Sequence, residues 1–237
     1  MTLSRRTILW GGVAAGLLGP SSALAADQRL LQNRLELWAH YARRTKNVMA
    51  RLVTTRETSL LDEPLVTQGS LVFDAPTTLL MRDDGLVGSS SLVEGESITV
   101  IPNQPRLAVP PAVEPALREA QKWLSTILLR LFAPPPLEEG GERSLIEGMR
   151  INVPRRSFRI ELLPARGSVV RKTFRSVTVH LDPVVGTVNQ IMIAQTQGDR
   201  LRLQITDHRQ NVEQADIDAV LDTVRGKERP TGKLGDP

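Results

Sequence analysis

The stretch Gln68-Gly-Ser-Leu-Val-Phe-Asp-Ala-Pro-Thr-Thr-Leu-Leu-Met81 decides which fold class the sequence predicts. It contains two short β-rich runs, residues 70–73 and 78–81, separated by an Asp-Ala-Pro turn signal. Both runs are apolar at successive positions, which predicts strands that are buried on both faces rather than on one. Either a helix or loop packs on the second face, or the strands border an apolar cavity, and the pattern leaves both interpretations open.

Similar β-rich runs lie on both sides of this stretch. Together they cover residues 48–58, 68–74, 78–82, 86–93, 97–101, 158–163, 173–181, 187–195 and 200–206. Their close spacing, with turn signals between them, predicts an antiparallel meander. In the last run, Leu201, Leu203 and Ile205 alternate with polar side chains, so this strand is expected to have one buried and one solvated face.

Three segments carry apolar residues at the three-and-four spacing of an amphipathic helix. They are residues 27–44, 113–132 and 212–224. The second must end before the prolines at 134–136, and the third is expected to stop at Gly226. The sequence therefore predicts an α+β fold, in which helices pack on an antiparallel sheet.

The first 25 residues have the order of a secretory leader: Arg5-Arg6, then an apolar run, then Ala23-Leu-Ala25. Adjacent arginines before apolar residues favour twin-arginine export, with an ordinary unfolded route as the alternative. We therefore expect a signal peptide at residues 1–25, one domain at residues 26–226 and a disordered tail at residues 227–237. The chain has no cysteine, so disulfides, a thiolate metal site and lipid attachment are not expected. These features predict a soluble periplasmic protein.

The composition argues against a nucleic-acid partner. The formal net charge is +4, and one Tyr, four Phe and three Trp in 237 residues leave few rings for stacking on bases. Basic residues gather between Arg155 and Arg175. They are interpreted either as solvated strand edges or as a docking site for an anionic membrane or an acidic partner.

No catalytic signature is visible in the sequence. His40, His180 and His208 lie far apart and lack metal-ligand spacing, and the serine run at 89–91 lacks a glycine-flanked nucleophile elbow. A pair of carboxylates could still converge in space, as glycosidases require, although the scarce aromatic residues argue against a sugar cleft. We expect no enzyme activity, no metal and no cofactor.

Several longer phrases resemble one known family. They are Val48-Met-Ala-Arg-Leu-Val-Thr-Thr-Arg56, residues 68–76 followed by Asp83-Asp-Gly85, Phe158-Arg-Ile-Glu-Leu-Leu-Pro164, Val188-Asn-Gln-Ile-Met-Ile193 and Gly198-Asp-Arg-Leu-Arg-Leu-Gln-Ile205. In order and pattern they resemble the periplasmic outer-membrane lipoprotein carriers, the LolA-like proteins. The resemblance spans most of the chain after residue 26 and consists of apolar patterns with a few Gly, Pro and Asp landmarks.

The resemblance implies an unclosed half-barrel covered by helices, with a cavity for acyl chains between sheet and helices. On that basis residues 27–44 and 113–132 are expected to form the lid. The side chains expected to bind lipid are Leu71, Phe73, Leu79, Met81, Leu124, Ile127, Leu131, Phe158, Ile160, Val177, Val179 and Met192.

The function that the resemblance implies is a soluble monomeric carrier. It would shuttle the acyl chains of a lipoprotein or lipid from an inner-membrane donor to an outer-membrane acceptor protein. The alternative is a regulatory sensor of the same fold, which recognises lipid or a membrane protein and transports nothing. The family has an arginine before the proline that corresponds to Pro76, and here Ala75 stands in its place. The lid is therefore expected to be held differently, and the cargo stays open between lipoprotein, free lipid and glycolipid.

Overall fold

The computed structural model describes residues 21–59, 61–85, 88–104, 115–133, 149–152 and 159–228. Within these residues, ten strands form one sheet whose neighbouring strands are all antiparallel. The strands are β1 (Asn47–Glu57), β2 (Leu65–Asp74), β3 (Thr78–Asp83), β4 (Ser89–Glu94), β5 (Ser97–Pro102), β6 (Met149–Asn152), β7 (Arg159–Pro164), β8 (Phe174–Leu181), β9 (Val188–Gln195) and β10 (Arg200–Gln210). Their spatial order is β5-β4-β3-β2-β1-β10-β9-β8-β7-β6. Two meanders therefore meet where β1 pairs with β10.

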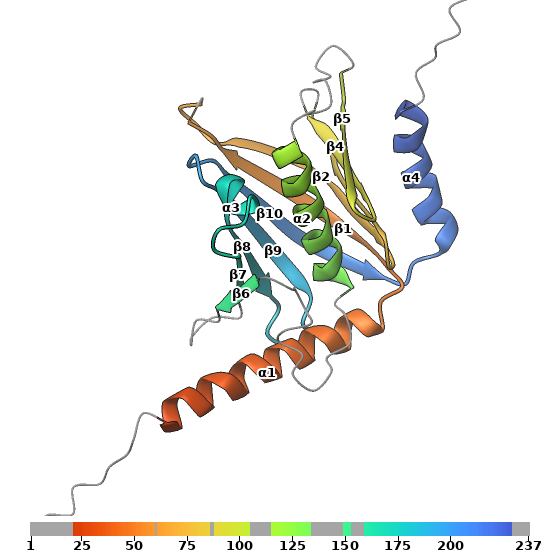
Figure 1. The fold of residues 1–237 in the computed structure, drawn as a ribbon. Coiled ribbons are helices and arrows are strands. Elements are labelled where there is room, and N and C mark those ends of the chain that lie inside the picture. Colours follow the sequence, from red (N-terminus) through yellow and green to blue (C-terminus); the bar gives the residue numbers. More distant parts are fainter. Residues whose placement is uncertain are drawn as a thin grey trace, which may run out of the picture.

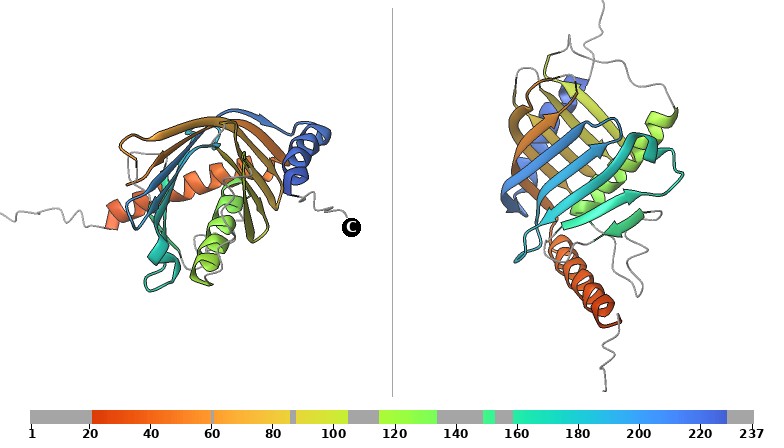
Figure 2. Two further views of the ribbon diagram at one scale, coloured as in Figure 1. Left: turned by 90° about the horizontal axis from the view of Figure 1, so that it is seen from above. Right: turned by 90° about the vertical axis from the view of Figure 1, so that its left-hand side faces the viewer.

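The sheet curves strongly without closing on itself (Figure 2). In the described part of the chain its two edges are β5 and β6, and these do not pair with each other. This arrangement is an α+β half-barrel, which confirms the fold class expected from the sequence.

Four helices accompany the sheet in the described ranges (Figures 1 and 2). The helix α1 (Ser21–Arg43) crosses one end of the sheet, and α2 (Pro115–Phe132) lies inside the curve. The single turn α3 (Val170–Thr173) precedes β8, and α4 (Gln214–Glu228) packs outside the curve. Neither β6 nor α3 was predicted, because four residues are too few to show a periodic pattern.

The expected leader and tail lie mostly outside the described residues, and residues 21–25 of the expected leader form the start of α1. Residues 1–20 of the expected leader and residues 229–237 of the expected tail belong to that undescribed part. The predicted stop at Gly226 is wrong, because α4 continues to Glu228. A Cβ added at Gly226 would meet nothing within 4 Å. An exposed glycine costs a helix only about 1 kcal/mol relative to alanine, so it does not have to end one.

The main core lies between the concave face of the sheet and the helices α1 and α2. Strand alternation places Leu71 and Phe73 of β2 on this face, together with Val177 and Val179 of β8, and all four are buried. The buried side of α1, which includes Trp38, closes one end of the same core. Burial of this continuous apolar surface supplies the main driving force for the fold.

A second, smaller core lies on the convex face. Val72, Leu80 and Leu92 are cross-strand neighbours on β2, β3 and β4, and they pack against Ile217 and Leu221 of α4. The strands that are apolar on both faces are therefore covered by α2 on one side and by α4 on the other. For the convex face, a packed helix and not a cavity explains the pattern.

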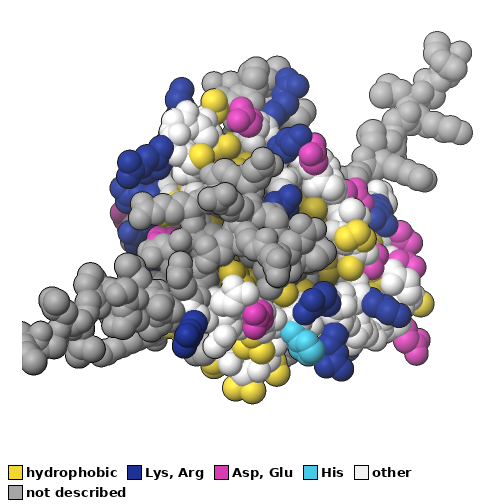
Figure 3. All heavy atoms as spheres, turned by 60° about the horizontal axis from the view of Figure 1, so that its bottom comes forward, with side chains coloured by type: hydrophobic (Ala, Val, Ile, Leu, Met, Phe, Trp, Pro, Cys, Tyr) yellow, Lys and Arg dark blue, Asp and Glu magenta, His cyan; other side chains and the backbone are white. Residues whose placement is uncertain are grey.

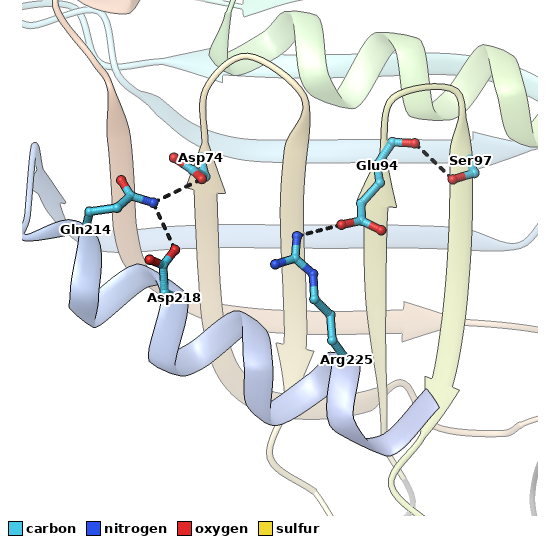
Figure 4. Close-up of polar contacts among 6 residues, drawn as sticks. All are labelled: Asp74, Glu94, Ser97, Gln214, Asp218 and Arg225. Atoms are coloured by element: carbon cyan, nitrogen blue, oxygen red, sulfur yellow. Dashed lines mark hydrogen bonds and ion pairs between the residues drawn. The ribbon is translucent and has the colours of Figure 1, made fainter. Parts of the chain in front are cut away.

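Polar contacts fix α4 along this face (Figure 4). The Arg225 guanidinium lies 2.7 Å from the Glu94 carboxylate on β4. At the other end of the helix, the Gln214 amide donates to Asp74 on β2 at 3.2 Å and to Asp218 at 3.1 Å. The α4 helix is thus joined to strands far from it in sequence.

Candidate functional site

The side chains predicted to bind lipid gather mainly on the concave face. Phe73 pairs with Leu79 and Leu71 with Met81 across β2 and β3, while Ile160 of β7 pairs with Val179 of β8. Because residues that pair directly across neighbouring strands share a face, each pair points to the same side as α2. The predicted residues of two distant segments are therefore brought together by the curvature of the sheet.

The α2 helix supplies the opposite wall of this site. Ile127 and Leu131 are buried against the sheet, and Leu124 is partly buried there. The ring of Phe132 stacks on Phe73 with centroids 5.4 Å apart. The indole nitrogen of Trp38 donates to the Leu131 carbonyl at 2.7 Å, which attaches the end of α2 to α1.

The expected open cavity is filled by α2 at these positions. Leu71, Phe73, Leu79, Val177 and Val179 are each 0% exposed. Ile127, Leu131 and Ile160 are each 1% exposed. An acyl chain could therefore contact these side chains only if α2 moved away from the sheet.

One predicted residue lies on the opposite face, and another cannot be placed. Met192 pairs with Arg202 and Thr178, so it lies on the convex side, opposite its neighbours Ile191 and Ile193. Four successive apolar residues in β9 hide this alternation, and only the partner strands identify the face. Phe158 lies outside the described residues.

The aromatic contacts of α2 were missed by the sequence analysis. Trp123 stacks on Phe174 at the start of β8, with ring centroids 5.5 Å apart. The scarcity of aromatic residues was used to argue against a sugar cleft, whereas three of the contacts that hold α2 use them. The sequence alone could not show that several of the few aromatic residues gather around one helix.

The hydroxyl of Ser125 is the buried polar group on the inner side of α2. It is 0% exposed, and it donates to the Lys122 carbonyl of the same helix at 2.8 Å. Its hydrogen bond would therefore move with the helix. On the outer side, the Lys122 ammonium lies 2.6 Å from the Glu96 carboxylate, with both side chains exposed.

A groove of about 300 Å³ on the convex face is lined by charged side chains, in contrast to the apolar concave face. Arg200 and Arg202 lie 3.9 Å from Glu57, and Arg159 lines the same groove. Burial, and next the Arg159 cation, lower the pKa of His180 on the neighbouring strand. Mixed charges make this groove a poor site for an acyl chain, so the concave face is the better candidate.

Other kinds of site find little support in the described part of the chain. In the described ranges no cluster of three or more His, Asp or Glu could hold a metal ion. Within the same ranges, no helix has the length and apolar character needed to span a bilayer. The basic cluster predicted between residues 155 and 175 is divided: Arg159 faces the convex groove, Arg171 and Lys172 lie on α3, and residues 155–156 lie outside the described residues.

Neither a family model nor a curated protein matches this chain. Solved structures do. A LolA superfamily protein from Nitrosomonas europaea is 9% identical with a TM-score of 0.39, and the match covers 78% of this chain and 96% of that one. The Mycobacterium tuberculosis lipoprotein LppX is 13% identical with a TM-score of 0.37, covering 78% and 98%. The Pseudomonas aeruginosa MucA/MucB complex is 14% identical with a TM-score of 0.34, covering 78% and 59%. Proteins of the superfamily that the sequence resembles are thus among the structures to which this chain is similar, and the likeness concerns the fold alone.

Proposed function

We propose that this protein binds the acyl chains of a lipid or lipoprotein on its concave face, under α2, and carries them between membranes in the periplasm. The observation that carries the proposal is one continuous apolar sheet face that the amphipathic helix α2 covers, with α1 closing one end. Leu124, Ile127 and Leu131 on that helix occupy the space that an acyl chain would take.

Apolar contacts of this kind can be exchanged for others. They are non-directional, and an acyl chain of about 14 methylenes offers about 11 kcal/mol of equivalent burial, at about 0.8 kcal/mol each. The α2 helix keeps its own backbone hydrogen bonds when it moves as a unit, and the Ser125 hydroxyl keeps its partner. When cargo displaces α2, the apolar contacts that are lost and gained are therefore of similar free energy. A carrier requires this balance because it must also release its cargo.

The hydrogen bond from Trp38 to the Leu131 carbonyl provides a point about which α2 can rotate. It anchors the C-terminal end of α2 to α1, while the contact between Lys122 and Glu96 at the middle of the helix is exposed. We infer that α2 swings about its C-terminal end and opens at its N-terminal end.

Cross-linking α2 to the sheet tests this proposal. The native chain has no cysteine, so the double variant Lys122→Cys/Glu96→Cys carries only two thiols, both at exposed positions. A short bismaleimide would join them and hold α2 down. We expect the untreated double variant to bind a fluorescent fatty acid as the native protein does, and the cross-linked form to lose most of that binding.

Each single-cysteine variant, alkylated with a monofunctional maleimide, is the matched control and should bind normally. Equal binding before and after cross-linking would exclude α2 as a lid. No binding by the native protein would exclude the acyl site itself. Transfer between donor and acceptor vesicles is a second readout, and binding without transfer would favour the sensor function over transport.

A further inference from the structure

The turn between β8 and β9 exposes two adjacent valines. Val184 is 79% exposed and Val185 is 52% exposed, although the strands that lead to them are well buried. The turn lies at the end of the sheet that α1 crosses (Figure 1). Single exposed valines are common on protein surfaces, but a neighbouring pair at the tip of a turn needs a separate explanation.

The turn is held firmly in place. The Asp182 carboxylate accepts hydrogen bonds from the backbone amides of Val184 and Val185 at 2.8 and 2.9 Å. These two bonds also lower the pKa of Asp182, so the carboxylate stays charged and bonded. Gly186 has a φ of +79°, and a Cβ added there would lie 2.8 Å from the Leu37 carbonyl oxygen of α1. The turn is therefore fixed against α1, and its two valines cannot fold inward.

Basic residues lie near these valines. His40 and Arg44 at the C-terminal end of α1 line the same surface groove as Val184 and Val185. Arg43 and Lys46, next to them in the chain, are exposed. In the view that brings this side forward, hydrophobic side chains lie near Lys and Arg, a histidine and one acidic side chain (Figure 3). The charged Asp182 carboxylate lines the same groove, so one negative charge stands against the cations Arg43, Arg44 and Lys46, and these four groups together are net positive.

We propose that this surface, defined by Val184, Val185, Arg44 and Lys46, docks on a bilayer with anionic headgroups. The valines would enter the headgroup region while the cations contact lipid phosphates. Each Lys or Arg near such a surface contributes roughly a fivefold gain in partitioning, so the docking is weak and reversible. It goes beyond the proposed function, since none of these four residues belongs to the concave face.

Vesicle sedimentation tests the apolar part of the surface. The probe is a vesicle of phosphatidylcholine and phosphatidylglycerol in equal parts, compared with phosphatidylcholine alone. We expect the native protein to bind the anionic vesicles at low salt, and Val184→Ser/Val185→Ser to bind about tenfold more weakly. Val66→Ser is the matched control, because Val66 is 58% exposed on β2 at the far end of the sheet, and it should bind as the native protein does.

Charge reversal tests the electrostatic part. Arg44→Glu/Lys46→Glu should lose at least tenfold in binding, whereas Arg171→Glu/Lys172→Glu, an equal reversal on α3, should change it by less than about twofold. Equal binding to neutral vesicles, equal loss in the two charge reversals, or no binding by the native protein would each overturn the proposal. Thermal unfolding of every variant confirms that it is folded. The vesicles need no cargo, so this result is independent of fatty-acid uptake under α2.

Discussion

The two halves of the sheet are covered differently, although both are antiparallel meanders of similar length. In the half formed by β2 to β5, α2 packs on the concave face and α4 on the convex face. In the half formed by β7 to β10, the concave face is buried, while the convex face carries a groove lined by Arg159, Arg200 and Arg202. The covered half is a three-layer structure and the other half has two layers.

The difference shows that the apolar pattern of a strand depends on whether one or both of its faces are covered. The strand β10 alternates between Leu203 and Ile205 inside and Arg202 and Gln204 outside, as a strand with one covered face should. The strand β3 carries Leu79 inside and Leu80 outside, and both are 0% exposed. The α4 helix is therefore a structural part of the domain, even though it lies at the end of the described chain.

The largest expected effect is on the covered convex face. Leu80→Ala removes a fully buried side chain between β3 and α4 and should lower the free energy of unfolding by about 3 kcal/mol. Urea unfolding followed by circular dichroism measures it. A loss below about 1 kcal/mol would mean that α4 does not pack on this face in solution, and the two halves would then be alike.

The corresponding change on the uncovered convex face should matter less. Met192→Ala removes a partly exposed side chain from the rim of the groove, and we expect a loss of about 1 kcal/mol or less. The same urea titration applies. Ile193→Ala, one residue along on the concave side, is the internal control and should be clearly more destabilising, by about 2 to 4 kcal/mol.

The ion pair that joins α4 to β4 should contribute little. Arg225 and Glu94 are 42% and 45% exposed, so Arg225→Ala is expected to lower stability by about 0.5 kcal/mol, and less at high salt. A double-mutant cycle with Glu94→Ala isolates the pair. A coupling energy above about 2 kcal/mol would show that charge, and not Leu80 and its neighbours, holds α4 in place.

The smallest expected effect is a pH dependence on the uncovered half. Burial and Arg159 lower the pKa of His180 in the folded protein, so the unfolded chain binds the proton more readily. Stability should therefore fall as the pH drops below about 6.5, the ordinary histidine value. In His180→Gln this fall between about pH 7.5 and about pH 5.5 should shrink.

The sequence predicted which strands are covered on both faces, but not which helix covers each face. Double burial of residues 70–73 and 78–81 was predicted correctly from apolar residues at successive positions, but the covering helix lies 140 residues downstream, as the contact between Gln214 and Asp74 shows. No local pattern encodes such a pairing. Met192 was placed on the wrong face for a related reason: only its cross-strand neighbour Arg202 reveals which side is solvated.

The sequence predicted which residues form the candidate site, but not whether the space between them is open or filled. The resemblance implied Leu71, Phe73, Val177 and Val179 as cavity wall, and the strand pairing places all four on one face. Whether that face is open or filled depends on how far α2 descends into it, which is decided by contacts such as Trp38 with the Leu131 carbonyl. Such contacts depend on tertiary geometry, which periodicity does not contain.

Within the described ranges, the edges β5 and β6 stay unpaired, which has a consequence for the girth of the sheet. A closed barrel has a circumference fixed by its strand number and stagger. A sheet with a seam has no such limit, because small changes in twist between successive strands can widen or narrow it while every ladder hydrogen bond stays intact. The girth of this half-barrel can therefore change, and under the proposed function it could fit one acyl chain or several.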